Sequence, residues 1–132
     1  MNRVEYGHRR EAIGRQGVTR RSTLERELDA MRDEDKRLAE RVEEAASLTG
    51  QELFGVSERV ASGLLPASLM AKVDAAAAQL RWFQGAAEDE GRSRDIRRRE
   101  AEDRLQEVID DCRVRLAQLD DEFARGRREG MW

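Results

Sequence analysis

The sequence predicts an all-α protein, either an antiparallel helical hairpin or a small bundle with coiled-coil-like heptad seams. Charged residues make up 40% of the 132 residues, whereas a typical domain contains roughly 25%. Only 5% of the residues are aromatic, so large core side chains are scarce. Apolar residues also recur at alternating steps of three and four in three separate segments. Together these features suit long helices that each carry one apolar stripe and a wide solvated face.

Residues 1–21 are expected to form a basic arm that precedes a helical domain at 22–132. The arm holds six arginines and two glutamates, which gives it a formal charge of +4. Gly7, Gly14 and Gly17 are expected to interrupt a helix here, because each costs about 1 kcal/mol relative to alanine. We therefore expect the arm to be flexible, or to become partly helical when it docks.

The first helix is predicted over 22–49. Ser22 and Glu25 have the spacing of a capping box, which marks a helix start. The apolar positions that follow at steps of four and three are Leu24, Leu28, Met31, Leu38, Val42 and Ala45. Asp35 is the one polar residue in this heptad seam. It either fixes the register of the paired helices or lies beyond the overlap with the partner helix.

A short second helix over 51–62 and a sharp break at Leu65–Pro66 are predicted next. Gly50 is expected to close the first helix as a left-handed cap, and Gly63 is expected to end the second. Pro66 is the only proline in the chain, and the residue before a proline is disfavoured in a helix. Proline itself suits the first position of a new helix.

The remaining chain is predicted to form helices over about 66–90 and 93–126. One seam consists of Leu69, Val73, Ala76, Leu80, Phe83 and Ala87, and another of Leu105, Ile109, Cys112, Leu116, Leu119 and Phe123. Between them, 13 of the 17 residues at 88–104 are charged. The 18 steps from Ala87 to Leu105 equal five helical turns, so a single helix could hold both seams on one face. Gly91, followed by Ser93 as a candidate cap, favours a break instead.

The sequence argues against an enzyme. His8 is the only histidine and Cys112 the only cysteine, so one chain cannot build a histidine-based triad or a two-histidine metal site. The acidic clusters, such as 88–90, consist of sequence neighbours, which do not face one another on a helix. Cys112 lies on the apolar face and is expected to act as a small buried hydrophobe. No catalytic residue, cofactor or metal ion is therefore expected.

The expected location is the cytoplasm, without membrane association. No apolar run approaches the roughly 18–20 residues of a membrane span, and the N-terminus lacks the apolar region of a signal peptide. A single cysteine excludes an intramolecular disulfide. Lys36 and Lys72 are the only lysines, and this arginine bias indicates a GC-rich bacterial or bacteriophage genome.

The predicted hairpin pairs a shorter first helix with a longer third segment, which leaves part of the apolar seam without an internal partner. Another chain usually covers such a surface. We therefore expect a non-catalytic interaction protein: a scaffold, adaptor or small inhibitor, phage-borne or carried by a mobile element, that docks helix faces onto a protein or self-associates as a homo-oligomer. Tryptophan and arginine are enriched at binding hot spots. The expected partner-binding residues are Arg81, Trp82, Arg94, Arg97 and Arg98.

Two alternatives stay open. The arginine-rich arm and the basic run at 92–99 could contact phosphates, as in a nucleic-acid-associated factor. Flanking acidic residues and the lack of a helix-turn-helix or zinc-finger motif count against this function. The two seams separated by the break at Pro66 also resemble, in outline, the FliJ/YscO stalk proteins of type III export, and this resemblance implies an export stalk or chaperone.

Overall fold

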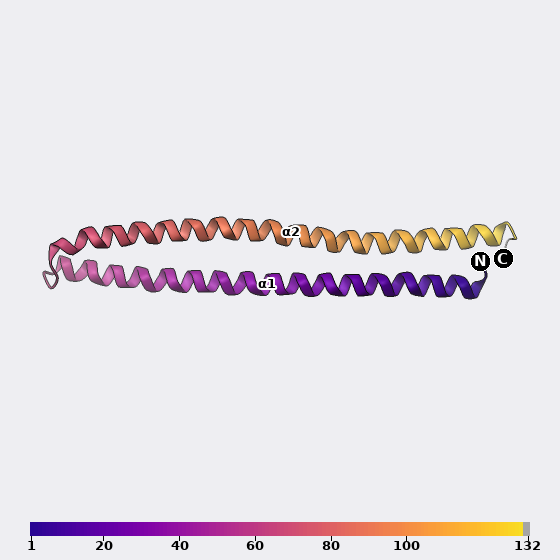
Figure 1. Cartoon of the computed structure of the whole chain (residues 1–132), viewed down its shortest axis with the longest axis horizontal. Coiled ribbons are helices and arrows are strands. Elements are labelled where there is room, and N and C mark those ends of the chain that lie inside the picture. The colour runs from indigo at the N-terminus through magenta and orange to yellow at the C-terminus, as the bar shows by residue number, and fades with distance from the viewer. Residues whose placement is uncertain (131–132) are drawn as a thin grey trace. The chain divides into compact units, whose positions relative to one another are not determined.

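The chain folds as a helical hairpin, seen here in a computed structural model that describes residues 1–130. Helix α1 (Arg3–Ala61) and helix α2 (Met70–Arg128) contain 59 residues each, and the short 3-10 helix η1 (Ala67–Leu69) precedes α2 (Figure 1). No strand occurs in the described part of the chain. The predicted all-α hairpin is confirmed. The helical domain was expected to reach 132, and its last two residues, Met131 and Trp132, lie outside the described range.

Helix α1 is one continuous helix where the sequence predicted a basic arm and two separate helices. It includes the expected arm at 1–21 from Arg3 onward, the helix expected at 22–49 and the helix expected at 51–62. A capping box does start α1, but it lies at Asn2 and Glu5. The Asn2 side chain accepts a hydrogen bond from the Glu5 backbone N–H at 2.8 Å, and Glu5 accepts one from the Asn2 N–H at 3.4 Å. Ser22 and Gly50, the expected caps, both lie within the helix, and Gly50 has no left-handed backbone.

Helix α2 is also continuous, so the break expected near Gly91 is absent. The charged stretch between the two seams is supported by ion pairs one helical turn apart. They join Arg92 to Asp89, Arg94 to Glu90 at 3.4 Å, and Arg98 to Glu102 at 4.0 Å. Each such pair stabilises a helix by about 0.2–0.5 kcal/mol. The sequence spacing of five whole turns between Ala87 and Leu105 is compatible with a single helix, the alternative that the sequence had left open.

Replacing Gly91 with alanine should therefore stabilise the protein by about 1 kcal/mol, because alanine loses less backbone entropy than glycine in a helix. Gly91 is exposed, and a Cβ there would meet nothing within 4 Å. Chemical denaturation followed by circular dichroism at 222 nm measures the change. An unchanged or lowered free energy of unfolding for Gly91→Ala would contradict a continuous α2.

The turn between the helices matches the sequence prediction at Gly63. The Gly63 N–H donates to the carbonyl of Val60 at 3.1 Å, and the Leu64 N–H donates to the carbonyl of Arg59 at 2.8 Å. These two bonds form a Schellman motif, which requires a left-handed residue, and Gly63 has φ of +80°. Pro66 is extended, with ψ of 140°, and precedes η1 as its cap, so α2 starts at Met70 instead of at 66.

The chain divides into two units. Unit 1 combines Met1–Met31 with the chain from Arg98 onward, and unit 2 is Arg32–Arg97. In unit 1 the buried apolar residues are Leu28, Ala101, Val108 and Leu119, and in unit 2 the buried apolar residue is Val73. Ala101 and Val108 were not among the expected seam residues, although they continue the three-four spacing through Leu105.

The expected seam residues are buried to different degrees. Leu28 and Leu119 are buried, with exposed fractions of 3% and 6%. The half-buried ones are Met31, Leu38, Val42, Leu80, Leu105, Ile109 and Leu116. Phe83 is exposed, with an exposed fraction of 41%, so it borders the unit 2 seam instead of filling it. Among the described helices, none is long and apolar enough to cross a membrane.

Candidate functional site: the turn-proximal surface

Charge is unevenly distributed along the chain. Residues 45–87, which we call the turn segment, contain six charged residues among 43, whereas the other 89 residues contain 47. The six comprise three acids and three bases, so the turn segment has no net formal charge. The whole turn segment belongs to unit 2. A long part of this otherwise highly charged protein is therefore neutral and weakly polar.

Exposed apolar side chains are concentrated in the turn segment. We call them the turn-proximal surface: Leu48, Phe54, Leu64, Trp82 and Phe83. The other large hydrophobic residues that are exposed in the described chain are all β-branched aliphatics, namely Val4, Val18, Ile96 and Val114. The exposed aromatic rings of residues 1–130 thus lie in the turn segment, and large exposed apolar groups with little charge around them are typical of binding sites.

Trp82 is the most exposed of these side chains, with an exposed fraction of 76%. Its position explains why. Two residues correspond to about 200° around a helix, so Trp82 points away from the seam to which half-buried Leu80 belongs. Burial against α1 therefore cannot account for a tryptophan at this position.

Arg81 and Trp82 are the two predicted partner-binding residues that lie in the turn segment. Arg81 is exposed beside the tryptophan. Leu48, Phe54 and Leu64 were not predicted from the sequence, because they fall outside the heptad pattern. The local loss of charge over 45–87 is the signal that would have found them.

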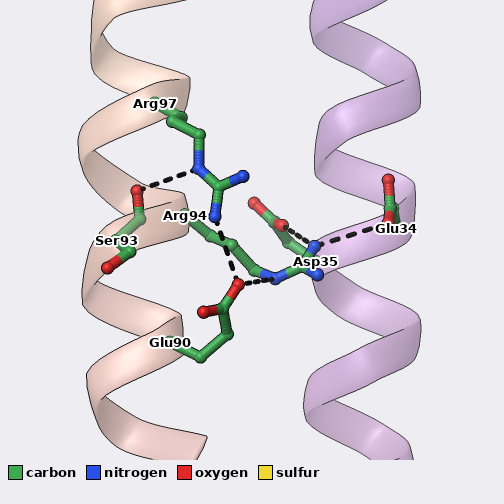
Figure 2. Close-up of polar contacts among 6 residues, drawn as sticks. All are labelled: Glu34, Asp35, Glu90, Ser93, Arg94 and Arg97. Carbon is green, nitrogen blue, oxygen red and sulfur yellow. Dashed lines mark hydrogen bonds and ion pairs between the residues drawn. The ribbon is translucent and has the colours of Figure 1, made fainter.

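Arg94, by contrast, lies at the centre of an ion-pair cluster within unit 2 (Figure 2). Its Nη1 donates to Asp35 Oδ1 of α1 at 3.2 Å and lies 3.5 Å from Glu34, while its Nε lies 3.4 Å from Glu90. The side chains of Arg94 and Asp35 retain only 25% and 18% of their exposure. The hydrogen bond to Asp35 raises the pKa of Arg94, while desolvation opposes it, so the guanidinium stays charged.

This cluster resolves the two interpretations of Asp35. Asp35 lies within the overlap of the helices and pairs with Arg94, which occupies the corresponding seam position of α2 between Ala87 and Ala101. A charged pair in an apolar seam favours the one register in which its members meet.

The other two predicted partner-binding arginines also form ion pairs. Arg97 Nη2 lies 3.1 Å from Glu90 within the cluster, and Arg98 pairs with Glu102 in unit 1.

Reversing one charge of this pair should lower the thermal stability. Asp35→Arg places a second guanidinium opposite Arg94, where the two cations repel each other in a partly buried site. The double exchange Asp35→Arg with Arg94→Asp should restore part of the lost melting temperature, because the pair is re-formed with its charges exchanged. Thermal unfolding followed by circular dichroism measures both variants. A double variant no more stable than Asp35→Arg alone would contradict direct pairing.

In unit 1 a second cluster joins the start of α1 to the end of α2. The Tyr6 ring stacks on Phe123, with centroids 4.2 Å apart and planes 9° from parallel. The Tyr6 hydroxyl donates a hydrogen bond to Asp120, and Arg10 Nη1 donates to both oxygens of Asp120 at 2.7 and 2.9 Å. Arg20 lies 3.5 Å from Asp111. The packing orders the expected arm, and part of its positive charge is paired within unit 1, which weakens the case for nucleic-acid binding.

The Tyr6–Asp120 hydrogen bond can be tested by titration, since Tyr6 is the only tyrosine. The hydrogen bond to Asp120, with desolvation, raises the pKa of Tyr6 above 10.0 by favouring the neutral phenol. The resulting stabilisation is fully present below pH 10.0 and is lost as the pH rises through the raised pKa of the folded state. Asp120→Asn should shift the phenolate absorbance titration to lower pH. Asp121→Asn, which changes the neighbouring carboxylate, should not, and identical curves for all three proteins would exclude the hydrogen bond.

Within residues 1–130, no group of three or more histidine, cysteine, aspartate or glutamate side chains is arranged to hold a metal ion. Cys112 is half-buried in unit 1, where its Sγ lies 3.8 Å from the carbonyl oxygen of Ile13 and faces Gly17. The cysteine lies at the helix contact where Gly17 leaves space, and it is half-buried where the sequence predicted a buried residue.

Comparisons with protein-family models, curated proteins and solved structures gave no match to this chain.

Proposed function

We propose that this chain is a non-catalytic interaction protein that binds a protein partner through the turn-proximal surface. The observation that carries the proposal is the exposure of Phe54, Trp82 and Phe83 in a segment with only six charged residues among 43. Aromatic side chains supply much of the energy at protein interfaces, and charged residues are depleted at interface centres. A neutral segment also lacks the positive field that attracts nucleic acid.

Pairing within unit 2 supports this function by holding the two helices in one register. The turn-proximal surface takes residues from α1, from the turn and from α2. A register shift would move its α1 residues, Leu48 and Phe54, along the axis relative to its α2 residues. The Asp35–Arg94 pair opposes such a shift, so the surface is prepared before binding and less conformational entropy is lost on association.

The proposal can be tested with the full chain immobilised and exposed to nuclease-treated extract of its host. Wild type and Ile96→Ala should retain the same protein, and Trp82→Ala should lose it. Ile96 is a suitable control because it is 56% exposed and lies in unit 2 but outside the turn segment. Quantitative mass spectrometry compares the three samples. Equal retention by all three would contradict the proposed site, and retention that depends on added nucleic acid and is lost at high salt would favour the nucleic-acid alternative.

A further inference from the structure

We propose that the outer face of α2 around Trp82 binds the same face of a second copy of this chain, forming a symmetric dimer. The inference rests on the proposed function and names its partner. A two-fold interface requires one patch to be complementary to itself. The shape and the charges of this face both meet that requirement.

Small residues share a helix face with Trp82. At positions −7, −4, +3 and +4 from the tryptophan lie Ala75, Ala78, Gly85 and Ala86, all of them exposed. A Cβ at Gly85 would meet nothing within 4 Å. One helix face thus carries both a protruding ring and a shallow row of small residues. Two such faces packed antiparallel would each receive the other's ring.

One acidic and one basic side chain flank this face, so each can pair with its opposite on a second copy. Asp74 and Arg81 are seven residues apart, which places them on one side of the helix, two turns from each other. Within the described chain neither makes an ion pair or a side-chain hydrogen bond. In the antiparallel pair in which Trp82 faces Ala75 of the second copy, Arg81 faces Ala76 of that copy. Asp74 of the second copy is two residues from this position, about 3 Å along the helix axis. Because the two copies are related by a two-fold axis, the ion pair between Arg81 and Asp74 occurs twice in the dimer.

The neutrality of the turn segment also favours a second copy over other occupants. Two copies brought together at this face do not repel each other, because the three acids and three bases of the turn segment balance. The rest of the chain has a formal charge of −3, so the turn segment is a long part of the chain that two copies can bring together without net charge. An anionic membrane or nucleic acid would instead require a basic patch.

Sedimentation equilibrium over a concentration series tests the dimer. Wild type and Ile96→Ala should approach twice the chain mass of 15.1 kDa. Trp82→Ala should weaken the dimer roughly thirtyfold, as expected for the loss of a binding hot spot. Asp74→Arg should also weaken it, and the double exchange Asp74→Arg with Arg81→Asp should restore it. Circular dichroism checks that each variant keeps its helices.

Fluorescence gives a second measurement on the same protein. The chain has two tryptophans, so Trp132→Phe leaves Trp82 as the only one. Its emission should move to shorter wavelength as the concentration rises, because dimerisation removes the indole from water. Emission independent of concentration would contradict the proposal.

Three other results would overturn the dimer: a wild-type monomer at all concentrations, dimerisation unaffected by Trp82→Ala, or a charge exchange that fails to restore what Asp74→Arg loses. A monomer that still captures another protein through Trp82 would overturn this inference and leave the proposed function standing. The remaining outcome is a dimer that depends on Trp82, together with capture of other proteins that does not change in Trp82→Ala. This outcome would support the inference, with the second copy as the partner.

Discussion

Replacing Leu28 with alanine should lower the free energy of unfolding by about 2–5 kcal/mol, the range for truncating a buried leucine. Leu28 has the smallest exposed fraction of the buried core residues, 3%. The described chain buries only five apolar side chains to this degree. Because the total stability of a small domain is typically about 5–15 kcal/mol, this single truncation should remove much of it. Urea denaturation followed by circular dichroism at 222 nm provides the measurement.

Leu48→Ala is the matched control, since it removes the same atoms from a leucine in the same helix. Leu48 is 54% exposed, so its truncation should change the free energy of unfolding by no more than about 0.5 kcal/mol. Equal losses for the two variants would contradict the assignment of Leu28 to the seam and Leu48 to the surface.

Gly17→Ala should destabilise the protein by up to about 2 kcal/mol, even though alanine is the better helix former. The new Cβ would lie 2.6 Å from Sγ and 3.1 Å from Cβ of Cys112. Overpacking a seam costs about 1–3 kcal/mol, which should exceed the gain of about 1 kcal/mol in helix propensity. The close contact between α1 and α2 in unit 1 therefore accounts for a glycine at this position.

Gly14→Ala is the comparison variant, and it should raise the free energy of unfolding instead of lowering it. A Cβ at Gly14 meets nothing within 4 Å, so this change should stabilise α1 by about 1 kcal/mol. Adding Cys112→Ala to Gly17→Ala should recover much of the loss by removing the clashing sulfur. If Gly17→Ala and Gly14→Ala stabilise equally, the helices do not meet closely at Cys112.

The candidate site was only partly accessible from the sequence. The enrichment of tryptophan and arginine at interfaces led to Arg81 and Trp82, which both lie in the turn segment. The same reasoning led to Arg94, whose charge pairs with Asp35 inside unit 2. The sequence cannot distinguish exposed Arg81 from paired Arg94, because the difference depends on which residue of the other helix lies opposite each arginine.

The sequence by itself determined the fold class and the position of the turn. Heptad spacing is local, and it identifies an apolar face without knowledge of the partner helix. Gly63 and Pro66 likewise act through their own backbone preferences, so the end of α1 could be located from a few residues.

The tertiary structure alone decided where each helix starts and that neither helix breaks before its end. The cost of the glycines in the expected arm is local, but the contacts that compensate for it join residues far apart, as in Tyr6 with Asp120, 114 positions away. The role of Asp35 also depended on Arg94, 59 positions away. Local propensities of about 1 kcal/mol per residue predicted breaks in both helices, and packing between the helices overrode them because it adds over many turns.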